Sequence, residues 1–222
     1  IVFFRREIDC LTSEVGDFFL LGLVAAAVRA SWIYKDGNVL KIRGHPVAPY
    51  RKFYKKRIYK MVKELEKFRG EGKVVVKAQD CREMDIQDGA IDCVITSPPY
   101  LNQIDYFRVY GFEDWLIGEK EGIDNYIGLE NVERYFRDME NVLKELFRVC
   151  KDKARLGFVI GNAYFPQEDK IVEADIRLAE LGEEAGFRAT QILVLNKRHA
   201  LQRRTIKRGE LRESLIVLEK KY

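Results

Sequence analysis

The sequence predicts an α/β protein built on a doubly wound, mostly parallel sheet with an antiparallel edge hairpin and helices on both faces. Two observations lead to this prediction. From residue 73 onward, short β-branched runs alternate with helical patterns, which is typical of layered α/β sheets. The last two predicted strands, 187–195 and 214–219, are joined by a stretch without a helical pattern, so they should pair antiparallel.

The first segment, residues 1–72, is predicted to be helical. An apolar helix is expected over residues 18–30, with Asp17 as its N-terminal cap. Residues 35–38 give a turn signal, and a second helix is expected over residues 50–68.

The second segment, residues 73–222, is predicted to form the α/β core. Its expected strands, each a short β-rich run, are 74–78, 91–96, 156–161, 187–195 and 214–219. An amphipathic helix is expected over residues 132–150, where apolar side chains recur at helical spacing. A further helix over 171–185 should end at Gly186 as its C′ glycine.

Composition excludes several classes of protein. With 47% hydrophobic and 33% charged residues, the chain can bury a core and is not disordered by composition. The longest apolar run, 18–28, is too short for a membrane span of about 20 residues, so we expect no membrane partner. Four dispersed cysteines and two histidines argue against a disulfide framework and a metal site, and favour reduced thiols in the cytoplasm.

One motif suggests chemistry: Ser97-Pro98-Pro99-Tyr100 directly follows a predicted strand, where open α/β sheets place their ligands. Pro98 has no backbone N–H, so the strand must end there, and each proline biases the residue before it toward extended geometry. The motif therefore predicts a stiff loop that presents a hydroxyl, backbone carbonyls and an aromatic ring.

That loop suits a planar base with an exocyclic amine. The Ser97 hydroxyl oxygen and the Pro98 carbonyl can accept the two amine hydrogens, and the Tyr100 ring can stack on the base. The alternative is a plain Pro-Pro turn that closes a strand, with Tyr100 packed on the surface.

The motif resembles the signature of the nucleic-acid amino-methyltransferases, which transfer a methyl group from S-adenosyl-L-methionine (SAM) to an exocyclic amine and have a Rossmann-like fold. Its serine form is characteristic of the DNA cytosine-N4 methyltransferases. The resemblance extends over about residues 73–222. It implies SAM as cofactor and DNA as partner, with these catalytic residues: Ser97, Pro98, Pro99 and Tyr100. It also implies these cofactor-binding residues: Asp80, Cys81 and Ser97.

The chain departs from this family mainly in the SAM-binding part, where the acidic residue expected to bind the SAM ribose is not identified. The glycine-rich loop that cradles the methionine part of SAM is not found, because Gly22 stands alone in an apolar helix and Gly70 and Gly72 follow a helix. The chain also begins at Ile1 rather than at a methionine. We therefore expect the missing loop to lie upstream of Ile1 or on a partner subunit.

The resemblance predicts methyl transfer to the N4 amine of cytosine in DNA, by direct in-line displacement on a flipped-out base. A carbon-5 cytosine enzyme would need a cysteine nucleophile, typically after proline, and no Pro-Cys pair occurs. Two alternatives stay open. One is an RNA amino-methyltransferase acting on guanine N2 of tRNA, and the other is a non-catalytic nucleic-acid-binding fragment or subunit of a split methyltransferase.

Two basic stretches bear on nucleic-acid binding, since a net charge of +4 permits it without requiring it. Residues 197–212 hold seven cations and one acid. The residues expected to contact phosphates are Arg198, Arg203, Arg204, Lys207 and Arg208. The alternative is a solvated loop. Residues 51–60 hold six cations and no acid, and here a solvated helix face is the preferred interpretation.

Overall fold

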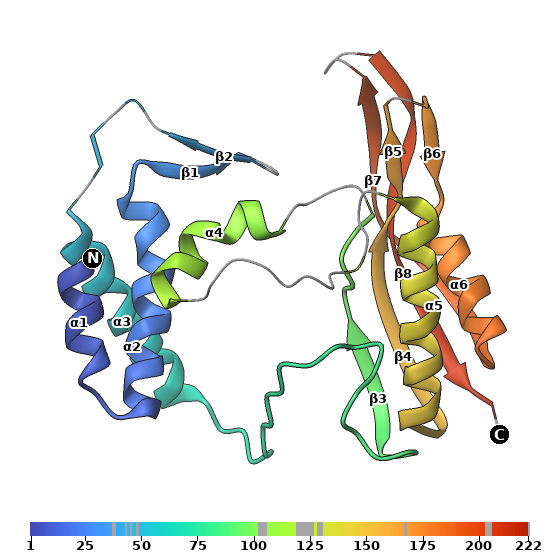
Figure 1. The fold of residues 1–222 in the computed structure, drawn as a ribbon, viewed down its shortest axis with the longest axis horizontal. Coiled ribbons are helices and arrows are strands. Elements are labelled where there is room, and N and C mark those ends of the chain that lie inside the picture. Colours follow the sequence, from blue (N-terminus) through green and yellow to red (C-terminus); the bar gives the residue numbers. More distant parts are fainter. Residues whose placement is uncertain are drawn as a thin grey trace. The chain divides into compact units, whose positions relative to one another are not determined.

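The structure is a computed structural model that describes residues 1–36, 39–42, 44, 46–47, 49–101, 106–118, 127, 131–166, 168–202 and 206–221. The chain divides into two compact units, which are coloured along the sequence in Figure 1. The first unit holds residues 1–75 and 105–124, and the second holds residues 76–104 and 125–222. The segment 105–124, which the sequence assigned to the α/β core, therefore belongs to the first unit.

The first unit consists of helices and one hairpin. Its elements are α1 (Val2–Asp9), α2 (Ser13–Ala27), a 3-10 turn (Val28–Ala30), β1 (Ile33–Asp36), β2 (Val39–Ile42), α3 (Tyr50–Lys67) and α4 (Tyr106–Ile117). The two expected helices are present, but Asp17 lies inside α2 instead of capping it. The helix begins five residues earlier than predicted, at Ser13, with Thr12 in extended geometry as its N-cap residue.

Helices α2 and α3 approach each other closely at Gly22. A Cβ atom at this position would lie 2.4 Å from Cδ1 of Ile58, so a larger residue would require the end of this side chain to move. The Tyr50 and Tyr54 hydroxyls donate to the carbonyls of Leu23 and Phe19 at 3.0 and 3.2 Å, which ties α3 to α2. Gly22 thus serves the packing of α2 against α3.

The second unit contains the α/β sheet. Its elements are β3 (Ile91–Thr96), α5 (Val132–Val149), β4 (Cys150–Gly161), β5 (Ala163–Phe165), β6 (Lys170–Val172), α6 (Ala174–Glu184), β7 (Phe187–Gln202) and β8 (Ile206–Lys220). The main sheet has the order β3-β4-β8-β7. Strands β3 and β4 are parallel, whereas β8 pairs antiparallel with both β4 and β7. The α/β class and the closing antiparallel hairpin of the predicted Rossmann-like fold are confirmed, while the described sheet is mixed rather than mostly parallel.

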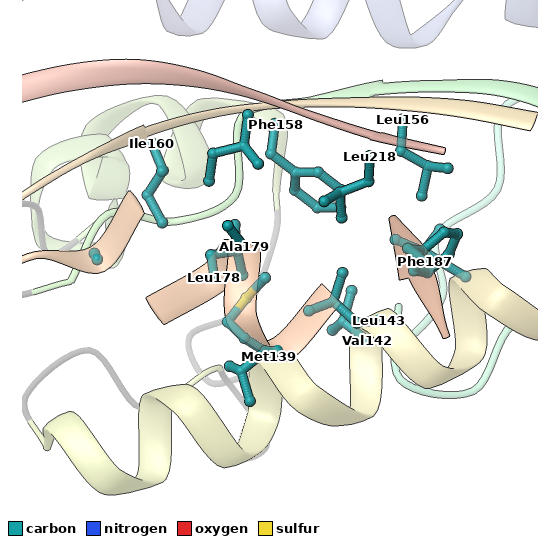
Figure 2. Packing of buried hydrophobic residues seen from close by; sticks show 14 of the residues in the cluster. Met139, Val142, Leu143, Leu156, Phe158, Ile160, Leu178, Ala179, Phe187 and Leu218 are labelled. Atoms are coloured by element: carbon teal, nitrogen blue, oxygen red, sulfur yellow. The ribbon is translucent and has the colours of Figure 1, made fainter. Parts of the chain in front are cut away.

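The core of this unit lies between the sheet and the helices α5 and α6. Figure 2 shows Leu156 and Phe158 of β4 pointing toward Met139 and Leu143 of α5. All four side chains are at most 1% exposed, and burying such a side chain contributes roughly 1.5–3 kcal/mol. Both helices cover the same face, in contrast to the prediction. On the opposite face, Ile95 is 85% exposed, and no described helix of this unit packs on it.

Two predicted elements before the closing hairpin differ from the structure. Residues 74–78 form no strand in this fully described stretch, and Val74 and Val76 are 82% and 89% exposed. A β-branched run has strand propensity, but a strand also needs a pairing partner. The helix expected from residue 171 begins at Ala174, because Lys170–Val172 pairs with β5 instead. It ends as predicted, with Gly186 at φ +106°.

The closing hairpin is longer than predicted. Pairing of β7 with β8 continues through Lys197 opposite Arg212 to Gln202 opposite Ile206. The backbone ladder continues although these side chains are polar, because it satisfies the N–H and C=O groups of both strands. The basic stretch expected in a loop therefore lies mainly on paired strands.

Candidate active site

The Ser97–Tyr100 loop begins where β3 ends. Thr96, opposite Phe158, is the last residue of β3 in the ladder, and the prolines that follow cannot extend it. Ser97 is exposed, whereas Pro98 is buried. The loop therefore turns into the protein and leaves the serine at the surface of the sheet edge.

Two hydroxyl groups anchor the loop. Tyr135 of α5, which is fully buried, donates from its hydroxyl to the Pro99 carbonyl at 2.9 Å. Tyr100 donates from its hydroxyl to Oε1 of Glu213 in β8 at 2.7 Å. Within the described part of the chain, the Ser97 hydroxyl and the Pro98 carbonyl make no hydrogen bond. The two predicted acceptors thus lie on a fixed loop and have no protein donor among the described residues, with Ser97 exposed and Pro98 buried.

A cavity of about 160 Å³ adjoins Tyr100. Its lining residues are Tyr100, Gly161, Asn162, Asn196, Arg198, Leu211, Arg212 and Glu213. An aromatic wall combined with amide, carboxylate and guanidinium groups can both stack on a planar ring and hydrogen-bond its edge. The cavity therefore has the chemistry that a base requires, next to the loop predicted to bind one.

A buried polar network supports the wall of this cavity. Asp175 of α6 is completely buried and accepts hydrogen bonds from Arg212 at 2.6 and 3.1 Å and from the Ser214 hydroxyl at 2.7 Å. Burial raises the pKa of Asp175, but the bonds from Arg212 and Ser214 outweigh this, so its pKa lies below the ordinary value. Because Glu213 lies between Arg212 and Ser214, the network fixes the carboxylate that holds Tyr100.

Sequence reasoning missed Tyr135, Asp175 and Glu213. Tyr135 lies on the amphipathic helix, where it has the pattern of a core residue. Glu213 belongs to a stretch that resembles the family, but nothing local indicates that it contacts Tyr100, 113 positions away. The pairing of β8 with β4 brings Glu213 to the loop, whereas Tyr135 reaches it from α5.

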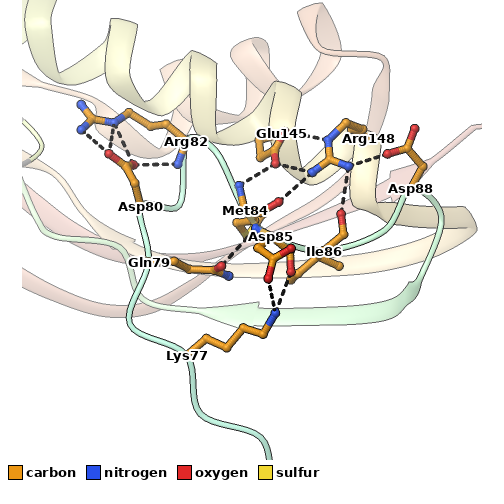
Figure 3. Close-up of polar contacts among 10 residues, drawn as sticks. All are labelled: Lys77, Gln79, Asp80, Arg82, Met84, Asp85, Ile86, Asp88, Glu145 and Arg148. Atoms are coloured by element: carbon orange, nitrogen blue, oxygen red, sulfur yellow. Dashed lines mark hydrogen bonds and ion pairs between the residues drawn. The ribbon is translucent and has the colours of Figure 1, made fainter.

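Asp80 lies in the irregular segment before β3. Its carboxylate accepts from Nε and Nη2 of Arg82 at 3.0 and 2.7 Å, and these bonds lower its pKa (Figure 3). Arg82 also donates to Asp138 of α5 at 2.9 Å. Since Asp138 is less than one helical turn from Tyr135, the structure brings Asp80 to the end of α5 that anchors the loop.

The adjacent Cys81 is exposed and has a free thiol, whose pKa is raised by burial of the sulfur and by Asp80. A raised pKa keeps the thiol protonated near neutral pH, so Cys81 has no nucleophilic character here. Any contribution of Cys81 to ligand binding is through its backbone or its protonated side chain.

The next residues are fastened to the other end of α5. Glu145 accepts from the backbone N–H of Met84 at 2.7 Å, and Arg148 donates to the carbonyls of Met84 and Ile86 at 3.0 and 2.9 Å (Figure 3). Bonds from Arg148 and Met84 lower the pKa of Glu145 to about 2. These contacts fix the path of the chain into β3 and play a structural role.

Comparison with known proteins assigns the family. The family model described as DNA methylase (N6_N4_Mtase) matches residues 91–222, which is more than half of the chain. The chain belongs to this DNA methylase family. Its match begins at the first residue of β3, so it includes the Ser97–Tyr100 loop, the cavity and the Asp175 network.

Curated relatives agree with this assignment. The methylase chain is 30% identical to the Type II methyltransferase M.BsoBI of Geobacillus stearothermophilus over 59% of its own length and 25% of that protein. It is 29% identical to the Type II methyltransferase M.AvaI of Nostoc sp. (strain PCC 7120) over 47% of its length and 32% of that protein. The chain thus spans about a quarter to a third of the relatives it matches.

Solved structures resemble the methylase more distantly. TTHA0409 from Thermus thermophilus has 19% identity and a TM-score of 0.42, covering 65% of this chain and 52% of that one. A SAM-dependent methyltransferase from Methanosarcina mazei has 13% identity and a TM-score of 0.40, covering 74% and 76%. The family assignment therefore depends on the family model.

The residues expected to bind nucleic acid are dispersed in the methylase. Arg198 lines the cavity beside Tyr100, whereas Arg208 is paired with Asp169 at 3.3 Å. Arg203, Arg204 and the side chain of Lys207 lie outside the described residues. Of this set, the structure brings only Arg198 to the candidate site among the side chains it describes.

Other kinds of site are not found in the described part of the methylase. Its histidine, cysteine and acidic side chains form no cluster there that could hold a metal ion. Cys10, Cys81, Cys93 and Cys150 are all free thiols. Among the described helices, none combines the length and apolar character needed to cross a membrane.

Proposed function

We propose that the methylase transfers the methyl group of SAM to the N4 amine of cytosine in DNA. The observation that carries this proposal is the Ser97–Tyr100 loop, which Tyr135 and Glu213 hold while its two amine acceptors have no protein donor among the described residues. The serine at the first position of the motif favours cytosine as the target.

The geometry of the loop explains how a weak nucleophile is activated. The lone pair of an exocyclic amine is delocalised into the ring. Hydrogen bonds from this amine to the Ser97 hydroxyl oxygen and the Pro98 carbonyl favour a pyramidal nitrogen and direct its lone pair away from the loop. After transfer the nitrogen must lose one proton, and the exposed Ser97 end of the site opens to water.

In a duplex the target base is stacked and paired, so it must leave the helix to reach this loop. The cavity beside Tyr100 offers a place for it. The Tyr100 ring supplies a stacking surface, and the hydroxyl bond to Glu213 fixes the ring's orientation. A fixed ring lowers the entropy lost when the base binds.

When bound, SAM supplies an electrophilic methyl group. The residues present fit its adenine and methyl ends. The exposed Asp80 carboxylate, oriented by Arg82, can accept from the adenine amine, with Cys81 beside it and Ser97 at the methyl-transfer end. Since no glycine-rich loop follows a strand in the described residues, the assignment is confined to Asp80, Cys81 and Ser97.

The test is nucleoside mass spectrometry of DNA from a bacterial host that lacks N4-methylcytosine and expresses the protein. We expect N4-methyldeoxycytidine with the wild type and a loss of orders of magnitude with Ser97→Ala or Tyr100→Ala. Ser13→Ala, at an exposed serine of α2, is the matched control and should leave the product unchanged. N6-methyldeoxyadenosine instead would overturn cytosine as the target, and methylguanine confined to tRNA would overturn DNA.

A thermal-shift measurement with SAM separates catalysis from simple binding. A shift that Asp80→Ala reduces would support the proposed cofactor residues. No shift, together with no methylated product, would instead identify a non-catalytic nucleic-acid-binding subunit.

A further inference from the structure

A groove of about 730 Å³ lies between α2 and α3 in the first unit. The small side chains of Ala25 and Ala26 line it on the α2 side. The cations that line it are Arg29, Lys56, Arg57, Lys60, Lys63 and Lys67. Glu64 is the one carboxylate in this lining, and it pairs with Lys60 at 3.6 Å. The groove is therefore strongly positive, in contrast to the nearly balanced composition of the chain.

The lysines of the groove form a row along α3. Positions 56, 60, 63 and 67 follow helical spacing, so their side chains lie on one face. At 1.5 Å per residue, the row is about 16 Å long. Duplex DNA carries one negative charge per about 1.7 Å of its axis, so the row can face several phosphates at once. Such a length exceeds what a single small anion needs.

Two features of the groove favour a bound anionic ligand over solvation by water alone. Like charges four residues apart destabilise a helix by a few tenths of a kcal/mol, and a polyanion would remove this repulsion. The Nε donor of Arg57 is buried and, among the described residues, has no hydrogen-bond partner. An unsatisfied buried donor costs about 1–3 kcal/mol, which a phosphate oxygen reached by rotation of the guanidinium would recover.

From these observations we infer that the α2–α3 groove binds the phosphodiester backbone of DNA. The sequence alone favoured a solvated helix face for this basic stretch. The structure changes that interpretation, because the cations line a concave surface with an unsatisfied arginine donor. The inference rests on the proposed function in one respect, namely that the polyanion is the DNA on which the methylase acts.

The test is fluorescence anisotropy of a labelled, non-specific DNA duplex with the full chain, repeated over a range of salt concentrations. Lys56→Gln combined with Lys63→Gln removes two exposed lysines of the groove. We expect roughly tenfold weaker binding at low salt, and a salt dependence whose slope is about 2 smaller, since each lost phosphate contact lowers it by about 0.9. The matched control is Arg51→Gln combined with Lys55→Gln, which changes the charge equally on residues of α3 outside the groove lining.

Equal losses for the two double variants would overturn the inference, because binding would then depend on net charge alone. An unchanged affinity and slope in the groove variant would overturn it as well. Groove-dependent binding of tRNA that exceeds binding of DNA would replace DNA by RNA as the ligand. The proposed function can fail independently of this inference. In that case the wild-type protein would bind DNA through the groove but form no N4-methylcytosine. Thermal melting shows whether each variant is folded.

Discussion

Two arginine–aspartate pairs in the second unit use the same chemistry in different surroundings. Arg212 holds Asp175 by two hydrogen bonds, and Arg82 holds Asp80 in the same way. The Asp175 side chain is completely buried, whereas that of Asp80 is 39% exposed. Water can therefore replace Arg82 around Asp80, but nothing can replace Arg212 around Asp175.

We infer from this difference in burial that the Arg212–Asp175 pair supports the fold, whereas the Arg82–Asp80 pair can bind a ligand. A buried carboxylate with all its lone pairs engaged fixes the elements around it, here α6 and β8. The Asp80 carboxylate also accepts several bonds from Arg82, but because it is exposed, a ligand can exchange with water or displace one of these bonds. We expect the two pairs to respond differently to the same substitution.

The largest expected effect is on stability, from Asp175→Ala. This substitution removes the acceptor of Arg212 and of the buried Ser214 hydroxyl. We expect it to cost about 3 kcal/mol of unfolding free energy, the lower end for a broken buried pair, because Arg212 keeps Glu173 as a partner at 3.1 Å. Asp80→Ala, the matched control, should cost less than about 1 kcal/mol because its pair is solvent-screened. Urea unfolding followed by circular dichroism measures both. Similar losses for the two variants would show that burial does not distinguish the pairs.

The next effect is on catalysis, from Tyr100→Phe and Glu213→Gln. Each weakens a bond between a hydroxyl and a charged group, worth about 1.5–3 kcal/mol, so methyl transfer should fall roughly 10- to 100-fold. We expect the loss in kcat, with thermal stability little changed, because Glu213 acts by positioning Tyr100. The double variant should be no worse than the more impaired single variant, since both act on one bond.

Tyr164→Phe is the control for this experiment. It removes a similar tyrosine–carboxylate bond, to Asp169 at 2.7 Å, in the β5–β6 hairpin. Transfer should remain at the wild-type rate. A Tyr164 variant as impaired as Tyr100→Phe would argue against a specific role for the Tyr100–Glu213 bond.

The parts of the site that sequence predicts are those with a local signal. Proline chemistry places the end of β3 and the Ser97–Tyr100 loop, and apolar periodicity places α5. The contacts that fix the loop have no such signal, since Tyr135 and Pro99 are 36 positions apart and Arg212 and Asp175 are 37 apart. Strand propensity likewise misleads at residues 74–78, because pairing is a property of the fold and not of the segment.

A third, smaller effect concerns pH. The folded-state pKa of Asp175 is lowered, since the bonds from Arg212 and Ser214 exceed the opposite effect of burial. A lowered pKa stabilises the fold above the unfolded pKa of about 3.9, and this contribution is lost as pH falls through the folded value. The stability difference between wild type and Asp175→Asn should therefore shrink as the pH falls below about 4. Urea midpoints over this range measure it, and a difference constant with pH would show that Asp175 does not titrate as inferred.

The smallest expected effect tests the exposed pair as a ligand site. Asp80→Ala should weaken SAM binding roughly tenfold, the equivalent of one hydrogen bond of about 1.4 kcal/mol, and leave DNA affinity within twofold. Asp85→Ala is the control, because Asp85 is also exposed and paired with a cation, Lys77 at 2.9 Å, in the same segment. Calorimetry with SAM and anisotropy with DNA give the two affinities. If Asp80→Ala weakened DNA binding more than SAM binding, its exposed carboxylate would be serving the nucleic acid, and the cofactor role would pass to other residues.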